Sequence, residues 1–182
     1  MNSEVQPVKL FGIEIDSINS VLAFMDWEHM AVHKGLTFHL SIYSTVTAGV
    51  PKYCEFRTGA KYIHLKQKNH RDGSDSTLCS FIEAPVIGTP GTLEVPSYNR
   101  NRNSNTVSSM KVYSNPNSIT GGTILDYDYL FASTTNQSAS SAVPSEDRFE
   151  WVLKPNTSYI FKLENLGDGD ATFVAKLNWY EH

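Results

Sequence analysis

Apolar residues recur at every second position in short runs along most of this chain, and no other feature of the sequence constrains the fold as strongly. The alternation is clearest in three runs, at 36–42, 149–153 and 173–179. Because successive side chains of a β-strand point to opposite faces, each run places one face in a core and the other toward solvent or a partner. The sequence therefore predicts strands rather than helices.

Weaker runs of the same kind lie at 52–57, 60–67, 77–84, 110–114, 123–131 and 157–163. Turn signals separate many of the runs, among them Asp72-Gly73, Pro90-Gly91, Asn115-Pro116 and Gly121-Gly122. These dipeptides supply the positive or fixed φ that a chain reversal requires. About nine short strands with frequent turns predict an all-β fold, a jelly-roll-like β-sandwich.

One domain accounts for the length, because 182 residues of which 40 % are apolar supply one sizeable core. We expect the sandwich to span residues 31–182 and residues 1–30 to form an N-terminal arm or a short helix. A helix over 17–30 is one interpretation, since Ile18, Val21, Leu22 and Met25 have spacings compatible with one apolar face. An extended arm leading into the first strand fits the same residues.

Charge and hydropathy argue against nucleic acid and membrane as partners. The formal net charge is −4 and the basic residues are scattered, so no surface is predicted to follow a phosphate backbone. No run approaches the ~18 apolar residues that a membrane span needs, and the first residues lack a signal-peptide pattern. We expect the chain to be made and kept in the cytosol. Cys54 and Cys79 lie in apolar runs and are expected to be buried, reduced thiols.

No motif predicts an enzyme, a metal site or a cofactor. A Gly-x-Ser-x-Gly sequence is absent, and neither cysteine has the local signature of a thiol enzyme. His29 and His33 have the i, i+4 spacing of helical zinc ligands, but no Glu base stands in the required place and a structural role is favoured. The closely spaced carboxylates around Asp72 and Asp168 are typical of turns rather than calcium loops.

The most distinctive local segment lies in one of two polar stretches that are too long for hairpin turns, 99–109 and 133–145. Tyr98 is followed by Asn-Arg-Asn-Arg-Asn, so an aromatic ring and the two guanidinium groups of Arg100 and Arg102 share one expected loop. Tyr and Arg are enriched at interface hot spots. The segment is a candidate binding site, with a solvated loop as the alternative.

Several segments, in this order, resemble a family of small head accessory proteins of tailed-phage virions, the capsid decoration or cement proteins. The first is the run from Asp26 through Trp27, His29 and His33 to Gly35 and Phe38. The others are Phe81 to Pro85, Gly91-Thr92, the Tyr98 to Ser104 run, Trp151 to Tyr159, and Leu177 to His182.

The resemblance implies a virion structural protein that binds the outer capsid surface and stabilises the head. Its implied partner is the major capsid protein, and a homotrimer is expected at a threefold position. Binding residues, for capsid or subunit contact, would be Asp26, Trp27, His29, His33, Tyr98, Arg100 and Arg102. The alternative is a receptor-binding or carbohydrate-binding module of a tail or head fibre, because a sandwich with aromatic, amide-rich loops also suits sugar recognition.

Overall fold

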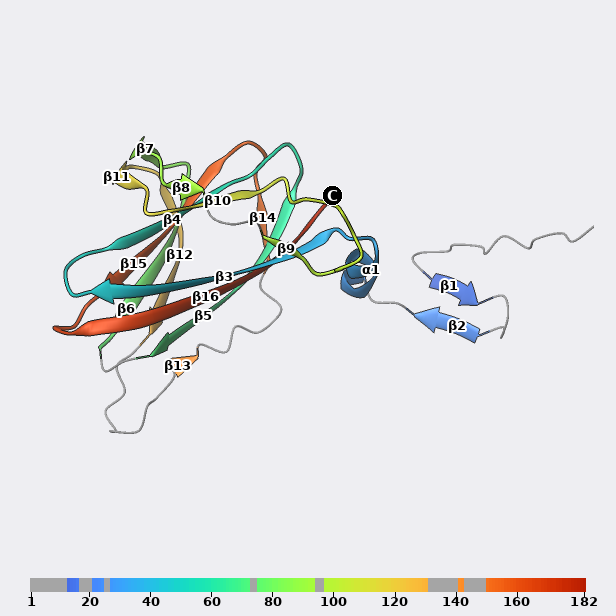
Figure 1. Cartoon of the computed structure of the whole chain (residues 1–182), viewed down its shortest axis with the longest axis horizontal. Coiled ribbons are helices and arrows are strands. Elements are labelled where there is room, and N and C mark those ends of the chain that lie inside the picture. Colours follow the sequence, from blue (N-terminus) through green and yellow to red (C-terminus); the bar gives the residue numbers. More distant parts are fainter. Residues whose placement is uncertain are drawn as a thin grey trace, which may run out of the picture.

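Two antiparallel six-stranded sheets make up most of the structure (Figure 1). The structure is a computed structural model, and it describes residues 13–16, 21–24, 27–72, 75–93, 97–130, 141–142 and 150–182. The first sheet has the order β12 (Thr123–Leu130), β6 (Thr77–Glu83), β15 (Ser158–Asn165), β4 (Lys52–Arg57), β10 (Lys111–Ser114), β8 (Thr92–Leu93). The second has the order β13 (Ser141–Ala142), β5 (Ile63–Asp72), β16 (Asp170–Glu181), β3 (Thr37–Thr47), β9 (Tyr98–Asn99), and β14 (Trp151–Leu153) also pairs with β5.

The long strands are paired in a nested way. β3 pairs with β16, β4 with β15, β5 with β14, and β6 with β12, so early strands lie beside late ones. Successive members of this series alternate between the two sheets. The whole chain must therefore fold before either sheet is complete.

The core lies between the facing sides of the two sheets. Along β16, buried residues alternate with more exposed ones almost without interruption, which matches the predicted period of two. Aromatic side chains fill the centre, where the Phe161 ring lies 4.9 Å from Phe56 and 4.7 Å from Phe81, measured between centroids. Each fully buried side chain of this size contributes about 1.5–3 kcal/mol.

The predicted all-β sandwich is confirmed, and most predicted strands appear close to their expected positions. The described residues form sixteen strands rather than about nine. The additional ones are short, such as β7 (Val86–Thr89) and β11 (Asn117–Thr120), which pair with each other. Short paired segments inside connections have too few residues to show a period, so sequence alternation missed them.

The predicted helix over 17–30 was wrong in its bounds. Val21–Phe24 is strand β2, paired with β1 (Ile13–Asp16), and the helix α1 spans Trp27–His33. A short apolar run fits helix and strand equally, and pairing with a neighbouring strand decided between them.

Two further expectations concern thiols and turns. Both cysteines are buried and neither forms a disulfide, as predicted. Burial raises the pKa of the Cys79 thiol well above its usual value, which keeps it protonated. Asp75 accepts a 2.7 Å hydrogen bond from the Gly169 amide, so its carboxylate supports a turn.

Candidate binding surface formed by α1 and β9

The end of α1 is set by a glycine. The amide of Gly35 donates to the Val32 carbonyl (2.9 Å) and that of Leu36 to the Ala31 carbonyl (3.0 Å), which closes the last turn. Gly35 has φ +67°, a left-handed conformation that glycine adopts at little cost. A Cβ placed there would lie 2.2 Å from the Ser104 hydroxyl, so the helix end and the loop after β9 are in direct contact.

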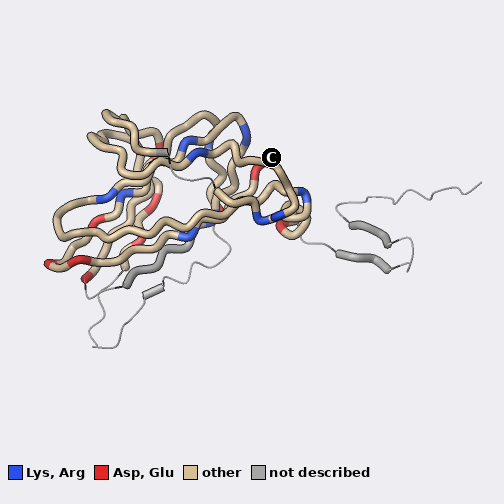
Figure 2. The backbone as a smooth tube through the Cα atoms, viewed as in Figure 1, with Lys and Arg blue, Asp and Glu red and all other residues tan. Residues whose placement is uncertain are grey.

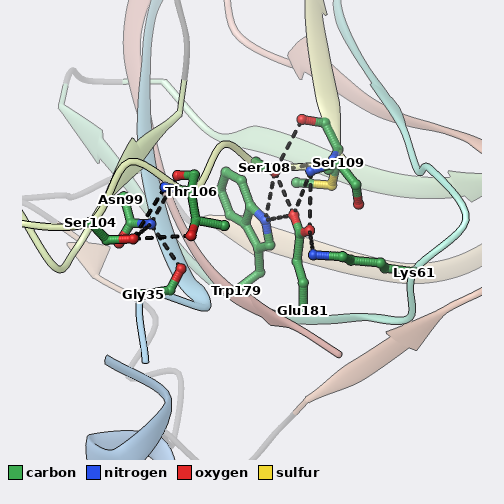
Figure 3. A network of polar contacts seen from close by, with 10 residues as sticks. Gly35, Lys61, Asn99, Ser104, Thr106, Ser108, Ser109, Trp179 and Glu181 are labelled. Atoms are coloured by element: carbon green, nitrogen blue, oxygen red, sulfur yellow. Dashed lines mark hydrogen bonds and ion pairs between the residues drawn. The ribbon is translucent and has the colours of Figure 1, made fainter. Parts of the chain in front are cut away.

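Asparagines hold that loop against the helix. The buried Asn99 side chain donates to the carbonyls of Gly35 (2.8 Å) and Thr106 (3.0 Å) and accepts from the Asn101 amide (2.9 Å). Asn101 in turn donates to the His33 carbonyl (2.9 Å). Figure 3 shows the Asn99 contacts. In the alternating Asn-Arg segment these two asparagines are therefore structural.

Arg100 and Arg102, which flank Asn101, are exposed, and the asparagine contacts hold their loop against the C-terminal end of α1. The Arg102 guanidinium lies 5.6 Å from the Tyr98 ring centroid, and the Lys34 ammonium lies 5.7 Å from that of Trp27. Both arrangements are cation–π contacts. We call this region the α1–β9 surface; its members are Trp27, His29, His33, Lys34, Tyr98, Arg100 and Arg102.

The two histidines of this surface form a pair. The Nε2 atoms of His29 and His33 are 2.9 Å apart, and their rings meet edge to face with centroids 4.7 Å apart. Their i, i+4 spacing on α1 puts them on one side of the helix. In the part of the chain that the structure describes, no group of three or more His, Cys, Asp or Glu residues could hold a metal ion.

Contacts with the outer face of the second sheet fix the position of α1. Glu28 forms an ion pair with Lys66 of β5, and Trp27 hydrogen-bonds the side chain of Tyr180 on β16. Figure 2 marks the positions of basic residues along the backbone near α1. A helix of seven residues is too short to be stable by itself, so these anchors and the loop contacts keep it folded.

Next to these anchors, Glu150 accepts hydrogen bonds from His64 and from the Tyr180 hydroxyl (2.8 Å). The rings of His64 and Tyr180 stack at 4.4 Å between centroids. Burial favours a raised pKa for Glu150, but the hydrogen bonds from His64 and Tyr180 outweigh it and the pKa lies below its usual value. Burial, followed by the Glu150 hydrogen bond, raises the pKa of Tyr180. This cluster was not predicted, because His64 and Glu150 are far apart in sequence and belong to no motif.

A buried carboxylate ties the long loop after β9 to the sandwich (Figure 3). Glu181 is fully buried and accepts hydrogen bonds from the Ser108 hydroxyl (2.6 Å), the Ser109 amide (3.0 Å) and the Trp179 indole (3.2 Å). The Lys61 ammonium lies 3.7 Å from the other carboxylate oxygen. Both ends of the loop are thereby fixed, one by Asn99 and one by Glu181.

Six of the seven predicted binding residues converge on the α1–β9 surface, although 65 residues separate His33 from Tyr98. Asp26 lies outside the described residues. Lys34 was not predicted as a member, and no signal distinguished it from other lysines. The surface offers cations, hydrogen-bond donors and exposed aromatic faces, which suits binding of a partner with acidic and aromatic groups.

Comparison with known proteins gives no family. No family model matches the chain, and no curated protein matches it. Among solved structures, the VP2 subviral particle of infectious bursal disease virus is similar at a TM-score of 0.18 and 11 % sequence identity. The similarity covers 96 % of this chain and 46 % of that one, so the chain spans less than half its length. Among the described residues, no helix is long and apolar enough to cross a membrane.

We expect Gly35→Ala to destabilise the protein by about 2–5 kcal/mol. The left-handed φ disfavours any Cβ by about 1–2 kcal/mol, and the contact with Ser104 adds about 1–3 kcal/mol of steric strain. Gly49→Ala is the matched control, since Gly49 has φ +70° with nothing within 4 Å of the added atom. Urea unfolding measures both. Equal losses for the two variants would show that the contact with Ser104 is unimportant.

Acid should weaken the fold through Glu150. Its folded-state pKa lies below the unfolded value, so the stabilisation is complete above the unfolded value of about 4.3 and is lost as pH falls through the folded pKa. Glu150→Gln should therefore cost about 1–2 kcal/mol at pH 7 and much less at pH 3. Unfolding free energies measured across this range test the expectation. A difference between variant and wild type that stays constant with pH would contradict it.

Proposed function

We propose that this chain is a non-catalytic binding protein of a tailed-phage virion, a decoration or cement protein that docks on the outer capsid surface through the α1–β9 surface. The observation that carries the proposal is the convergence of Trp27, His29, His33, Tyr98, Arg100 and Arg102 on one hydrogen-bonded, exposed region. Those residues came from the segments that resemble the decoration family, and the fold assembles them.

The fold is compatible with this proposal. We infer that the nested pairing of β3 with β16, β4 with β15, β5 with β14 and β6 with β12 is a jelly roll. Jelly rolls occur in viral capsid and lectin domains among others, so this inference is compatible with the proposal without selecting it. The proposed partner is the major capsid protein, and the proposed assembly is a trimer on a threefold position.

Such a protein would bind in many copies at equivalent positions of the capsid. Each copy needs only modest affinity, because copies that contact each other on a symmetric shell bind with avidity. A net charge of −4 limits adsorption to packaged DNA, while the local cations of the α1–β9 surface can meet acidic groups on the capsid.

Binding of the purified chain to expanded capsids that lack it tests the proposal, with the capsid melting temperature recorded before and after. Saturable binding with a raised melting temperature is the expected result. The double variant Arg100→Ala/Arg102→Ala should bind at least tenfold more weakly, since it removes two exposed charged hot-spot side chains. Lys111→Ala/Lys176→Ala is the matched control, because both lysines are exposed elsewhere and the charge change is the same. Equal affinities of the two double variants would contradict the proposed surface.

Sugar recognition is the second candidate, and one observation favours it. A small pocket is lined by polar groups, including Glu28, Arg100 and Asn178, together with the aromatic side chain of Tyr180. Aromatic faces next to planar polar side chains are what carbohydrate sites use. Retention of the chain on host glycans, together with no affinity for empty capsids, would select this function over capsid binding.

A further inference from the structure

One edge of the second sheet is open. β3 pairs with β16 over its whole length, from Thr37 opposite Tyr180 to Thr47 opposite Asp170. With β9 it pairs only at Phe38 and His39. In the described part of the chain, no strand pairs with the β9 side of β3 beyond His39. An uncovered strand edge is a template for pairing with another chain.

The backbone direction identifies which groups this edge offers. The Leu36 carbonyl accepts a hydrogen bond from the Glu181 amide, on the side of β16. The Thr37 carbonyl accepts one from the Arg100 amide, on the side of β9. Because directions alternate along a strand, Ser41, Tyr43 and Thr45 present their N–H and C=O groups to the open side. Tyr43 is also 72 % exposed. The edge therefore offers the backbone N–H and C=O groups of about three residues for hydrogen bonds with an added strand.

A groove runs beside this edge, between the two sheets. Its volume is about 200 Å³, and its lining includes Leu40 and Ile42 of β3, Cys54 of β4 and Leu163 of β15. Leu40 and Ile42 belong to the core-facing side of β3 but are only partly buried. A strand added at the edge would place alternate apolar side chains over them.

The same chain holds a separate two-stranded hairpin. Among the residues that the structure describes, β1 and β2 pair only with each other. An isolated two-stranded hairpin is marginally stable in water. The sequence of β1, Ile-Glu-Ile-Asp, alternates apolar and acidic residues, and one of its edges is not used by β2.

We propose that β1 of one copy adds to the open edge of β3 in a second copy, so that copies of this chain assemble by strand addition. Ile13 and Ile15 would occupy the positions facing the groove, and Glu14 and Asp16 the positions facing outward. Each copy gives one hairpin and accepts one, a head-to-tail contact that forms a ring where the rotation between copies closes and a filament where it does not. The proposal uses neither the α1–β9 surface nor a capsid, so its failure would leave the proposed docking through that surface standing.

Cross-linking of two differently tagged full-length chains tests this directly. One carries Glu14→Cys and the other Tyr43→Cys, and a short bismaleimide reagent is added; the native cysteines are buried. We expect a cross-linked species containing both tags. A partner carrying Thr123→Cys, exposed on β12 of the other sheet, is the control and should give little product. Equal yields with the control, or cross-linking only within a single chain that carries both Glu14→Cys and Tyr43→Cys, would overturn the proposal.

Sedimentation of full-length variants gives a second readout. Tyr43→Pro removes the outward N–H at a position where an edge strand tolerates proline, and should weaken self-association at least tenfold. Tyr43→Thr removes the ring but keeps the N–H, and should associate like the wild type. A monomeric wild type, or equal affinities of the two variants, would refute strand addition. Should the proline variant fail to fold, the cross-linking experiment decides.

Discussion

Glu181→Ala is expected to lower the free energy of unfolding by about 3–5 kcal/mol. The change removes the acceptor shared by Ser108, the Ser109 amide and the Trp179 indole. Each buried donor left without a partner costs about 1–3 kcal/mol. Lys61 is partly exposed and can turn to solvent, so its loss adds little.

Urea unfolding of Glu181→Ala beside Glu164→Ala measures this effect. Glu164 lies on β15 and pairs with Lys162 at 2.7 Å, with both side chains 29 % exposed, so its removal should cost no more than about 1 kcal/mol. Glu181→Gln should fall between the two, because the amide keeps one oxygen acceptor. A loss below about 1 kcal/mol for Glu181→Ala would mean that the network does not hold the loop.

Asn99→Ala should destabilise the protein by about 2–4 kcal/mol and also weaken partner binding at least tenfold. The substitution leaves the carbonyls of Gly35 and Thr106 and the Asn101 amide without their side-chain partner. The loop that presents Arg100 and Arg102 would then lose its position relative to α1, so the binding residues would no longer be pre-arranged.

Asn103→Ala is the matched control for this variant. Asn103 is exposed, and it is its backbone amide that bonds to Asn101, so the substitution should change stability by less than about 0.5 kcal/mol and leave binding intact. Thermal unfolding and capsid binding are measured for both variants. If Asn99→Ala loses stability but keeps full capsid binding, the arrangement of the α1–β9 surface does not matter for the partner.

The sequence by itself determined the class of fold. Burial of side chains on one face of a strand imposes a period of two that is local, so runs such as 173–179 identify strands without knowledge of their neighbours. The same local logic placed the reduced cysteines in the core and the long polar loop after Asn99. It did not determine the bounds of α1, because a short apolar run is compatible with both helix and strand.

Only the tertiary structure decided which residues meet. The Asn99 side chain contacts the end of α1 through the Gly35 carbonyl. Every residue has a backbone carbonyl, so no sequence pattern indicates which one a side chain will bind. The same is true of the His64 and Glu150 pair, and of the open edge of β3, which exists because β9 is only two residues long. Long-range pairing depends on the whole chain closing around one core, and this brings together side chains that local patterns treat as unrelated.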